Sequence, residues 1–256
     1  MIPMPVQLVI AGAFGLVIGS FLNVVIYRLP RGTSVVFPPS ACGSCRRELR
    51  WFENVPVLSW VVLGGRCARC KASISIQYPL VELTTGAIFV ATAAVTPAGP
   101  LLAARLMLGC ALVVLFAIDL EHQILPNVIT LPGIAVGLLF ALVGPPGWRS
   151  ALVGAAVGGG VLYAIAAGYY YLRHEDGLGM GDVKMLAMIG AFLGWQQMLL
   201  TLVLASFSGA IVGIGLVAFQ RGTMKYALPF GTFLAVGALA AMLGGQPIID
   251  WYAGFY

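Results

Sequence analysis

Long uncharged segments recur along this chain, and they constrain its fold more than any other feature. Crossing a hydrocarbon core of about 30 Å takes roughly 20 helical residues. We predict eight crossings, at residues 7–27, 79–96, 101–121, 124–143, 150–172, 183–195, 198–219 and 228–248. The composition agrees, because only 9% of the residues are charged, whereas soluble domains carry about 25%. The sequence therefore predicts an all-α polytopic membrane protein.

The sixth and seventh crossings share one uncharged run, Met185–Gln220. As a single helix this run would be about 54 Å long, which one crossing cannot use. We predict that residues 194–197, with the sequence GWQQ, form an interfacial turn that divides it.

Lysine and arginine residues support this count and indicate an orientation, since short loops rich in them stay on the cytoplasmic side. With the N-terminus outside, the cytoplasmic residues are Arg28, Arg31, Arg46, Arg47, Arg50, Arg66, Arg69, Lys71, Arg173, Lys184, Arg221 and Lys225. Only Arg105 and Arg149 remain at the opposite face. We therefore expect both termini outside. No positive charge precedes the first crossing, so we interpret it as a retained helix rather than a cleaved signal peptide.

The first cytoplasmic loop, residues 28–77, contains two Cys-x-x-Cys pairs separated by 21 residues. Four thiolates from two such pairs can coordinate one tetrahedral zinc ion, and the usual separation is roughly 15–20 residues. The alternative is a pair of redox-active dithiols or disulfides, although a reducing cytoplasm disfavours lasting disulfides. We favour a structural zinc ion bound by Cys42, Cys45, Cys67 and Cys70, because four protein ligands leave no open position for catalysis.

Two aspartates fall at the cytoplasmic edges of different crossings, Asp119 at the end of the third and Asp182 at the start of the sixth. Each alone has a structural interpretation, an interfacial helix end for Asp119 and a helix N-cap for Asp182. Together they suit an acid/base dyad, because two close carboxyl groups do not readily both ionise. One then activates water while the other polarises a peptide carbonyl, as in an aspartic peptidase.

Glycines at positions 177, 179 and 181 precede the second of these aspartates. A simple cap does not need three glycines. We interpret them as a movable mount, in which the backbone that carries Asp182 takes conformations barred to other residues and approaches a substrate.

Several longer strings occur in a characteristic order. They are GSFLNVVIYRLP at 19–30, WFENVPVLSW at 51–60, QYPLVELTTG at 77–86, AIDLEHQILPN at 117–127, GLGMGDVKMLAMIGAFLGWQ at 177–196 and LPFGTFLAVGAL at 228–239. With the paired cysteines, they closely resemble the bacterial prepilin peptidases, a family of intramembrane aspartic peptidases with a GxGD signature. One departure is Asn127, where many members of that family carry an aspartate.

This resemblance implies a bifunctional enzyme of the bacterial inner membrane that serves type IV pilus assembly or type II secretion. Such an enzyme cleaves the leader of prepilins or pseudopilins after a glycine at the cytoplasmic face. It then methylates the new N-terminal amine with S-adenosylmethionine. The resemblance assigns the catalytic pair to Asp119 and Asp182.

The chain is accordingly expected to contain a first transmembrane helix at 1–27, a zinc-binding loop at 28–77 and a peptidase core at 78–256. Membrane lipid is the other expected partner, because anionic lipid suits the basic cytoplasmic face, and no nucleic acid is expected. By elimination, the loop is the expected contributor to the methyl-donor site. Glu82 could assist the dyad or methyl transfer, but a hydrogen bond to a neighbouring helix is the favoured interpretation.

Two other function classes fit parts of the pattern. A proton-coupled transporter would place its acidic residues near the membrane midplane, whereas here they lie at the edge. A membrane thiol oxidoreductase would use the cysteine pairs directly and would tolerate the loss of Asp119.

Overall fold

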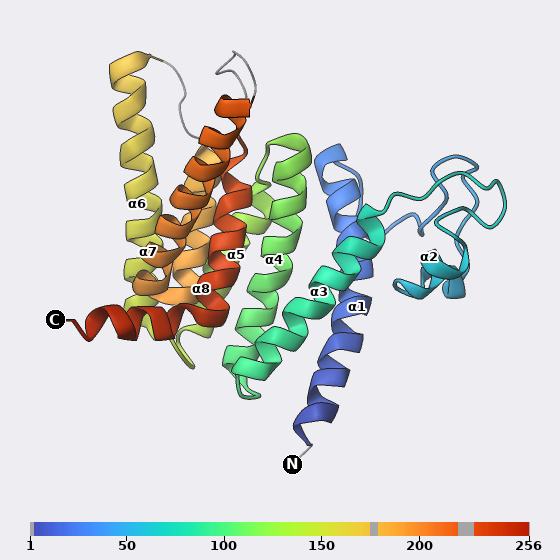
Figure 1. Ribbon diagram of the computed structural model, residues 1–256, viewed down its shortest axis with the longest axis horizontal. Coiled ribbons are helices and arrows are strands. Elements are labelled where there is room, and N and C mark those ends of the chain that lie inside the picture. Colours follow the sequence, from blue (N-terminus) through green and yellow to red (C-terminus); the bar gives the residue numbers. More distant parts are fainter. Residues whose placement is uncertain (1–2, 175–178, 220–227, 256) are drawn as a thin grey trace. The chain divides into compact units, whose positions relative to one another are not determined.

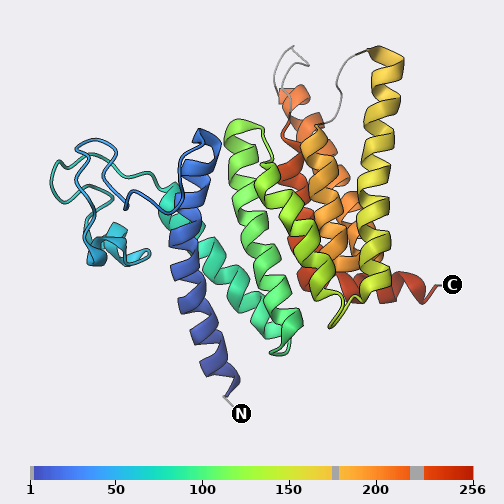
Figure 2. The ribbon, with the colours of Figure 1, turned by 180° about the vertical axis from the view of Figure 1, so that it is seen from behind.

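The computed structural model describes residues 3–174, 179–219 and 228–255. Every long element in these ranges is an α-helix, and the strand-like pairing is confined to two isolated bridges. The all-α prediction is therefore confirmed. The chain divides into two compact units, residues 1–98 and 99–256. Figure 1 labels their helices, and Figure 2 shows the same helices from behind.

The first unit pairs two long helices, α1 (Met4–Arg28) and α3 (Gln77–Val95). A Cβ on Gly15 of α1 would lie within 3 Å of Gly86 and Phe89 of α3, so the two helices pack closely. Their buried side chains include Leu22 and Ile26 on α1 and Val81, Ile88 and Phe89 on α3. The side-chain amide of Asn23 also donates a hydrogen bond to the carbonyl of Tyr78, with Nδ2 and O 3.0 Å apart. In the sequence, three short elements separate these helices: η1 (Leu29–Arg31), η2 (Trp51–Asn54) and α2 (Leu58–Val62).

The second unit contains the remaining five helices. They are α4 (Pro100–His122), α5 (Asn127–Phe140), α6 (Trp148–Arg173), α7 (Met180–Phe219) and α8 (Phe230–Ala253). Its core is apolar, with the side chains of Leu108, Leu112, Leu115 and Ile118 on α4 fully buried. The first half of α7 lies at the centre, since residues 185–194 are all buried.

Helix α7 is interrupted at Gly194, where φ is 78° and ψ is 173°. Only glycine adopts a positive φ of this kind without steric cost. A Cβ on Gly158 of α6 would lie near both Leu186 and Met198, so the segments on either side of the break pack on the same helix. The two ends of α7 lie at the same end of the second unit (Figures 1 and 2). The predicted division of this run is therefore confirmed, but the break lies at Gly194 alone and residues 195–197 are helical.

Six described helices are long and apolar enough to cross a membrane: α1, α3, α4, α6, α7 and α8. Helix α5 is apolar but shorter than the predicted crossing at 124–143, because Pro126 immediately precedes it and turn residues follow Phe140. With α7 divided at Gly194, the described residues contain about the eight helical segments that were predicted. Gly177, Arg221 and Lys225, which contributed to the predictions of a movable mount and of the orientation, lie outside the described residues.

Candidate active site and metal centre

Asp119 lies in the last turn of α4, and its side chain contacts the beginning of α8. The residue is only 4% exposed. Its Oδ2 atom accepts a hydrogen bond from the backbone N–H of Thr232, at 2.9 Å. The first N–H groups of a helix have no partner within the helix, and this end carries a partial positive charge. The N-terminus of α8 therefore stabilises a negative charge on Asp119.

Gly231 permits this close approach between α8 and the carboxylate. A Cβ atom at this position would lie 2.8 Å from Oδ2 of Asp119, closer than real Cβ atoms come to other atoms. The hydrogen bond from Thr232 thus depends on the absence of a side chain at the preceding residue.

Asp182 lies in the first turn of α7 and is 7% exposed. It is not the N-cap, because Gly179 precedes the helix and Asp182 is its third residue. Within the described part of the chain, its Oδ1 atom has no hydrogen-bond partner. Gly181, the residue before Asp182, and Gly231, which lies against Asp119, both pack on Leu125, so the two aspartates lie at one site in the second unit.

Leu125, in the connection between α4 and α5, packs between the two helices that begin at this site. A Cβ on Gly181 of α7 would lie 2.8 Å from Cβ of Leu125, and one on Gly231 of α8 would lie 3.0 Å from its Cδ1 atom. Leu125 therefore holds the first turns of both helices close to Asp119.

Gly181 does not adopt the unusual backbone conformation expected of a movable mount. It is helical and is not among the described glycines with positive φ. What Gly181 provides here is space for Leu125. The expected mobility of this segment stays a prediction.

Sequence reasoning also missed Gly231, Thr232 and Leu125. The only signal was their presence in the strings LPFGTF and ILPN, to which no role was assigned. No contact was predicted for Lys184 either. Its Nζ atom donates a hydrogen bond to Oδ1 of Asn127, at 2.8 Å, and so links α7 to α5.

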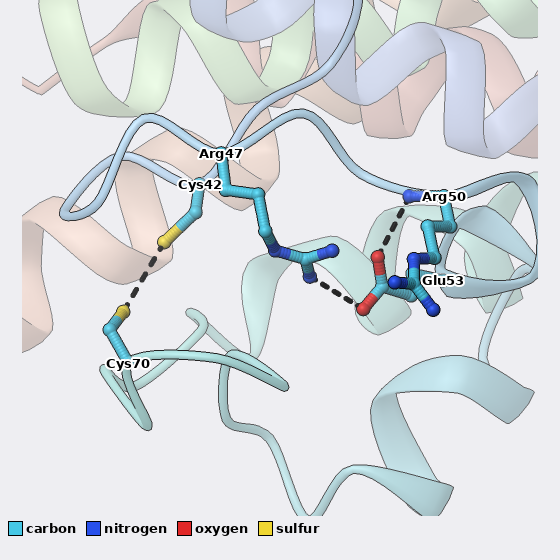
Figure 3. Close-up of polar contacts among 5 residues, drawn as sticks. All are labelled: Cys42, Arg47, Arg50, Glu53 and Cys70. Atoms are coloured by element: carbon cyan, nitrogen blue, oxygen red, sulfur yellow. Dashed lines mark hydrogen bonds and ion pairs between the residues drawn. The ribbon is translucent and has the colours of Figure 1, made fainter.

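The four cysteines of the loop converge in the first unit. Their sulfur atoms all lie within 4.8 Å of one another, and Sγ of Cys42 is 3.7 Å from Sγ of Cys70 (Figure 3). Tetrahedral coordination with Zn–S bonds of about 2.3 Å places sulfurs roughly 3.8 Å apart. All four thiols are free rather than disulfide-bonded. The predicted cluster is therefore present, and its geometry suits a metal ion.

Both Cys-x-x-Cys pairs have the same backbone geometry. In the first turn, the N–H of Cys42 bonds to the carbonyl of Arg47, and that of Arg46 bonds back to Cys42. In the second, Cys67 and Ala72 make the equivalent bond at 2.9 Å, and Lys71 bonds back to Cys67. Two copies of one turn thus present their sulfurs to a common centre.

At two of the four cysteines, Cys67 and Cys42, backbone N–H groups also favour the thiolate form that metal binding requires. Hydrogen bonds from the N–H groups of Cys70 and Arg69 lower the pKa of Cys67 to about 6. Those from Cys45 and Ser44 lower the pKa of Cys42 in the same way.

An ion pair joins the first cysteine turn to η2. The guanidinium of Arg47 donates to Oε1 of Glu53 at 2.6 Å, and the backbone N–H of Arg50 donates to Oε2 at 2.7 Å (Figure 3). The hydrogen bond from Arg47 is the main cause that lowers the pKa of Glu53. This carboxylate is therefore already neutralised.

Two family models match the chain, one in each compact unit. Residues 13–96 match the Bacterial Peptidase A24 N-terminal domain, and residues 106–214 match the Type IV leader peptidase family. No solved structure matches the chain significantly.

Curated relatives match nearly the whole chain, and three from different genera all carry the name prepilin leader peptidase/N-methyltransferase. The Aeromonas salmonicida protein is 40% identical over 93% of this chain and 91% of its own length. The Burkholderia pseudomallei protein is 40% identical over 96% of this chain and 88% of its own length. The Pseudomonas aeruginosa protein is 36% identical over 94% of this chain and 91% of its own length. This coverage includes both compact units with their aspartate pair and cysteine cluster, and the chain therefore belongs to the type IV leader peptidase family.

Proposed function

We propose that this chain cleaves the leader from type IV prepilins or pseudopilins and methylates the N-terminal residue that cleavage exposes. The relatives that share 36–40% of its residues bear the name of both activities. The observation that carries the peptidase assignment is the pair of buried aspartates, one from α4 and one from α7, at the site where the first turns of α7 and α8 pack on Leu125.

The two carboxyl groups have different surroundings, and these differences support different roles. Asp119 receives the N–H of Thr232 at the positive end of α8, so it is the ionised member that takes a proton from the attacking water. The carboxyl group of Asp182 also has hydrogen bonds with the backbone of Gly179 and of Asp182 itself, but its Oδ1 atom has no partner among the described residues. It is the protonated member, whose O–H polarises the scissile carbonyl.

The enzyme acts in the bacterial inner membrane, with the aspartate pair at the cytoplasmic face and both termini outside. Eight basic residues in or beside the loop at 28–77 support this orientation: Arg28, Arg31, Arg46, Arg47, Arg50, Arg66, Arg69 and Lys71. Anionic lipid headgroups are the natural partners of such a basic surface.

The cysteine cluster holds a structural zinc ion. The four sulfurs have the spacing of tetrahedral ligands, and the backbone bonds to Cys42 and Cys67 favour thiolates. Zinc would join the two cysteine turns and thereby stabilise the fold of the loop. The competing redox function predicts disulfides in the purified protein.

The proposed peptidase is tested by the variants Asp119→Asn and Asp182→Asn in a prepilin cleavage assay. An amide can neither accept nor supply the required proton, so we expect each variant to lose about 10²-fold or more in cleavage rate. Asp250→Asn, which changes an exposed aspartate of α8, is the matched control and should cleave normally. Substantial turnover by either dyad variant would refute the assignment.

A further inference from the structure

The first unit contains a cavity of about 360 Å³ that the peptidase chemistry does not use. It lies among α1, the beginning of α3 and the cysteine loop. Residues that line it include Asn23, Tyr27, Trp60, Tyr78 and Glu82. Sites for small molecules and cofactors are commonly about 300–1,000 Å³ and are mostly apolar with a few polar groups. Both the size and the lining suit a cofactor-sized ligand.

Glu82 places a carboxylate in this cavity without a cationic partner. The residue is 6% exposed, and Oε2 accepts the backbone N–H of Val57 at 2.7 Å. The hydroxyl of Ser20 also hydrogen-bonds to this carboxylate. No ion pair with Glu82 occurs among the described residues. An acidic group that is nearly buried and unneutralised favours a positively charged ligand.

The other charged groups in the cavity wall are already engaged. Glu53 is paired with Arg47. The guanidinium of Arg28 donates to the carbonyl oxygens of Ser34 and Pro38, at 2.9 and 2.7 Å. Glu82 is therefore the acid in this wall that remains for a ligand.

The backbone that bonds to Glu82 is strained. Val57 has φ of 60° and ψ of −52°, and the N–H of Leu58 bonds to the carbonyl of Pro56. This is a γ-turn of the rare, strained type, at a β-branched residue that seldom adopts positive φ. Strained backbone conformations of this kind are most frequent at ligand and active sites, where surrounding interactions maintain them. Here the hydrogen bond from Val57 to Glu82 maintains the strained conformation of Val57.

Trp60 supplies an aromatic surface to the same cavity. Its Nε1–H donates to the carbonyl of Ile74 at 3.2 Å, which satisfies the indole nitrogen and fixes the ring. Aromatic faces stack on nucleobases and attract cations. A fixed indole near an unpaired carboxylate thus matches a ligand that combines a purine with a positive charge.

We propose that this cavity is the binding site of the methyl donor, S-adenosylmethionine. Glu82 recognises its positive charge and Trp60 its adenine. This inference rests on the proposed methyltransferase function, and it places the donor site in residues 20–82, whereas both aspartates of the dyad belong to the unit at 99–256. The two activities then use separate sets of residues.

The charge that Glu82 is proposed to recognise is that of the sulfonium group, so the test compares two ligands that differ only there. S-adenosylhomocysteine is the thioether that remains when S-adenosylmethionine loses its methyl group, and its sulfur is uncharged whereas its amino-acid group is the same. We expect Glu82→Gln to weaken S-adenosylmethionine binding about 10-fold or more, because the variant removes the Coulombic attraction between the carboxylate and the sulfonium, and to leave binding of the thioether within about threefold. Calorimetry on the purified full-length protein in detergent measures both affinities. Glu48→Gln, which changes an exposed acid in the same loop, should bind both ligands normally.

A Trp60→Ala variant should weaken both ligands equally, because both contain adenine. If Glu82→Gln misfolds, as shown by loss of metal or of cleavage activity, the affinities of the Trp60→Ala variant test the proposed site instead. As a direct assignment, ultraviolet cross-linking of radiolabelled S-adenosylmethionine to the wild-type protein should label peptides within residues 20–82. Labelling only elsewhere, or unchanged S-adenosylmethionine affinity in Glu82→Gln, would overturn the proposed site.

Prepilin assays separate this proposal from the proposed function. If the wild-type protein cleaves and methylates prepilin while Glu82→Gln binds the donor normally, the cavity is the wrong site and the function stands. If the wild-type protein neither methylates prepilin nor binds the donor, the methyltransferase function itself fails.

Discussion

Replacing Gly231 by alanine should slow the peptidase strongly without unfolding it. The added Cβ would lie 2.8 Å from Oδ2 of Asp119, whereas ordinary van der Waals contact begins at 3.4 Å. The carboxylate must therefore retreat by about 0.6 Å or α8 must shift. A retreat of that size along the bond from Thr232 lengthens the N–H···O distance from 2.9 Å to about 3.5 Å, beyond an effective hydrogen bond.

The expected loss follows from the value of that bond. A hydrogen bond to a charged group contributes about 1.5–3 kcal/mol, and about 1.4 kcal/mol corresponds to a tenfold change in rate. If Asp119 needs this bond to act as the base, kcat for prepilin cleavage should fall about 10–100-fold. Thermal stability should change little, because alanine is a better helix former than glycine by up to about 1 kcal/mol.

Gly244→Ala is the matched control for this experiment. It makes the same substitution on α8, but a Cβ there would have no other atom within 4 Å. Cleavage of a purified prepilin by wild-type, Gly231→Ala and Gly244→Ala enzymes should be followed under single-turnover conditions, together with their melting temperatures. Wild-type turnover by a folded Gly231→Ala enzyme would show that the N-terminus of α8 does not support the catalytic carboxylate.

Two further predictions concern the metal cluster and the packing around the dyad. Purified protein should contain about one zinc ion per chain by elemental analysis, and metal-free wild-type protein with disulfides would contradict the zinc assignment. The Cys67→Ser variant should lose the zinc ion. It should also bind S-adenosylmethionine more weakly, because Cys42 and Cys67 line the donor cavity. Leu125→Ala should lower the cleavage rate, because Leu125 packs against the first turns of α7 and α8. The control Leu131→Ala, which changes an exposed leucine of α5, should lower it less. Equal rates in the two variants would contradict the positioning role of Leu125.

The sequence was sufficient for the features that depend on local composition and spacing. The run from Met185 to Gln220 is too long for one crossing, and Gly194 is the residue that permits the break. The paired cysteines have the separation that two metal-binding turns need. The aspartates stand out because charged residues are scarce near the apolar segments.

The contacts between distant segments could not be inferred in this way. The bond from Thr232 to Asp119 spans 113 positions in the chain, and neither residue indicates the other. The same holds for Val57 and Glu82, which are 25 positions apart. The favoured interpretation of Glu82, a hydrogen bond to a neighbouring helix, agrees with its contact to Ser20 of α1. It did not predict the bond to the strained turn at Val57. The packing of Leu125 against Gly181 was also not predicted, because such steric crowding is invisible in a linear pattern.

The break at Gly194 has a consequence for the depth at which Asp182 lies in the bilayer. The segment from Met180 to Leu193 has 14 residues and is about 21 Å long at 1.5 Å per residue. A typical hydrocarbon core is about 30 Å thick. If the turn at Gly194 lies at one interface, the segment stops roughly 9 Å short of the other, unless the bilayer thins around it. Asp182 then lies below the level of the headgroups, so water must reach the scissile bond through the protein rather than from the open membrane surface.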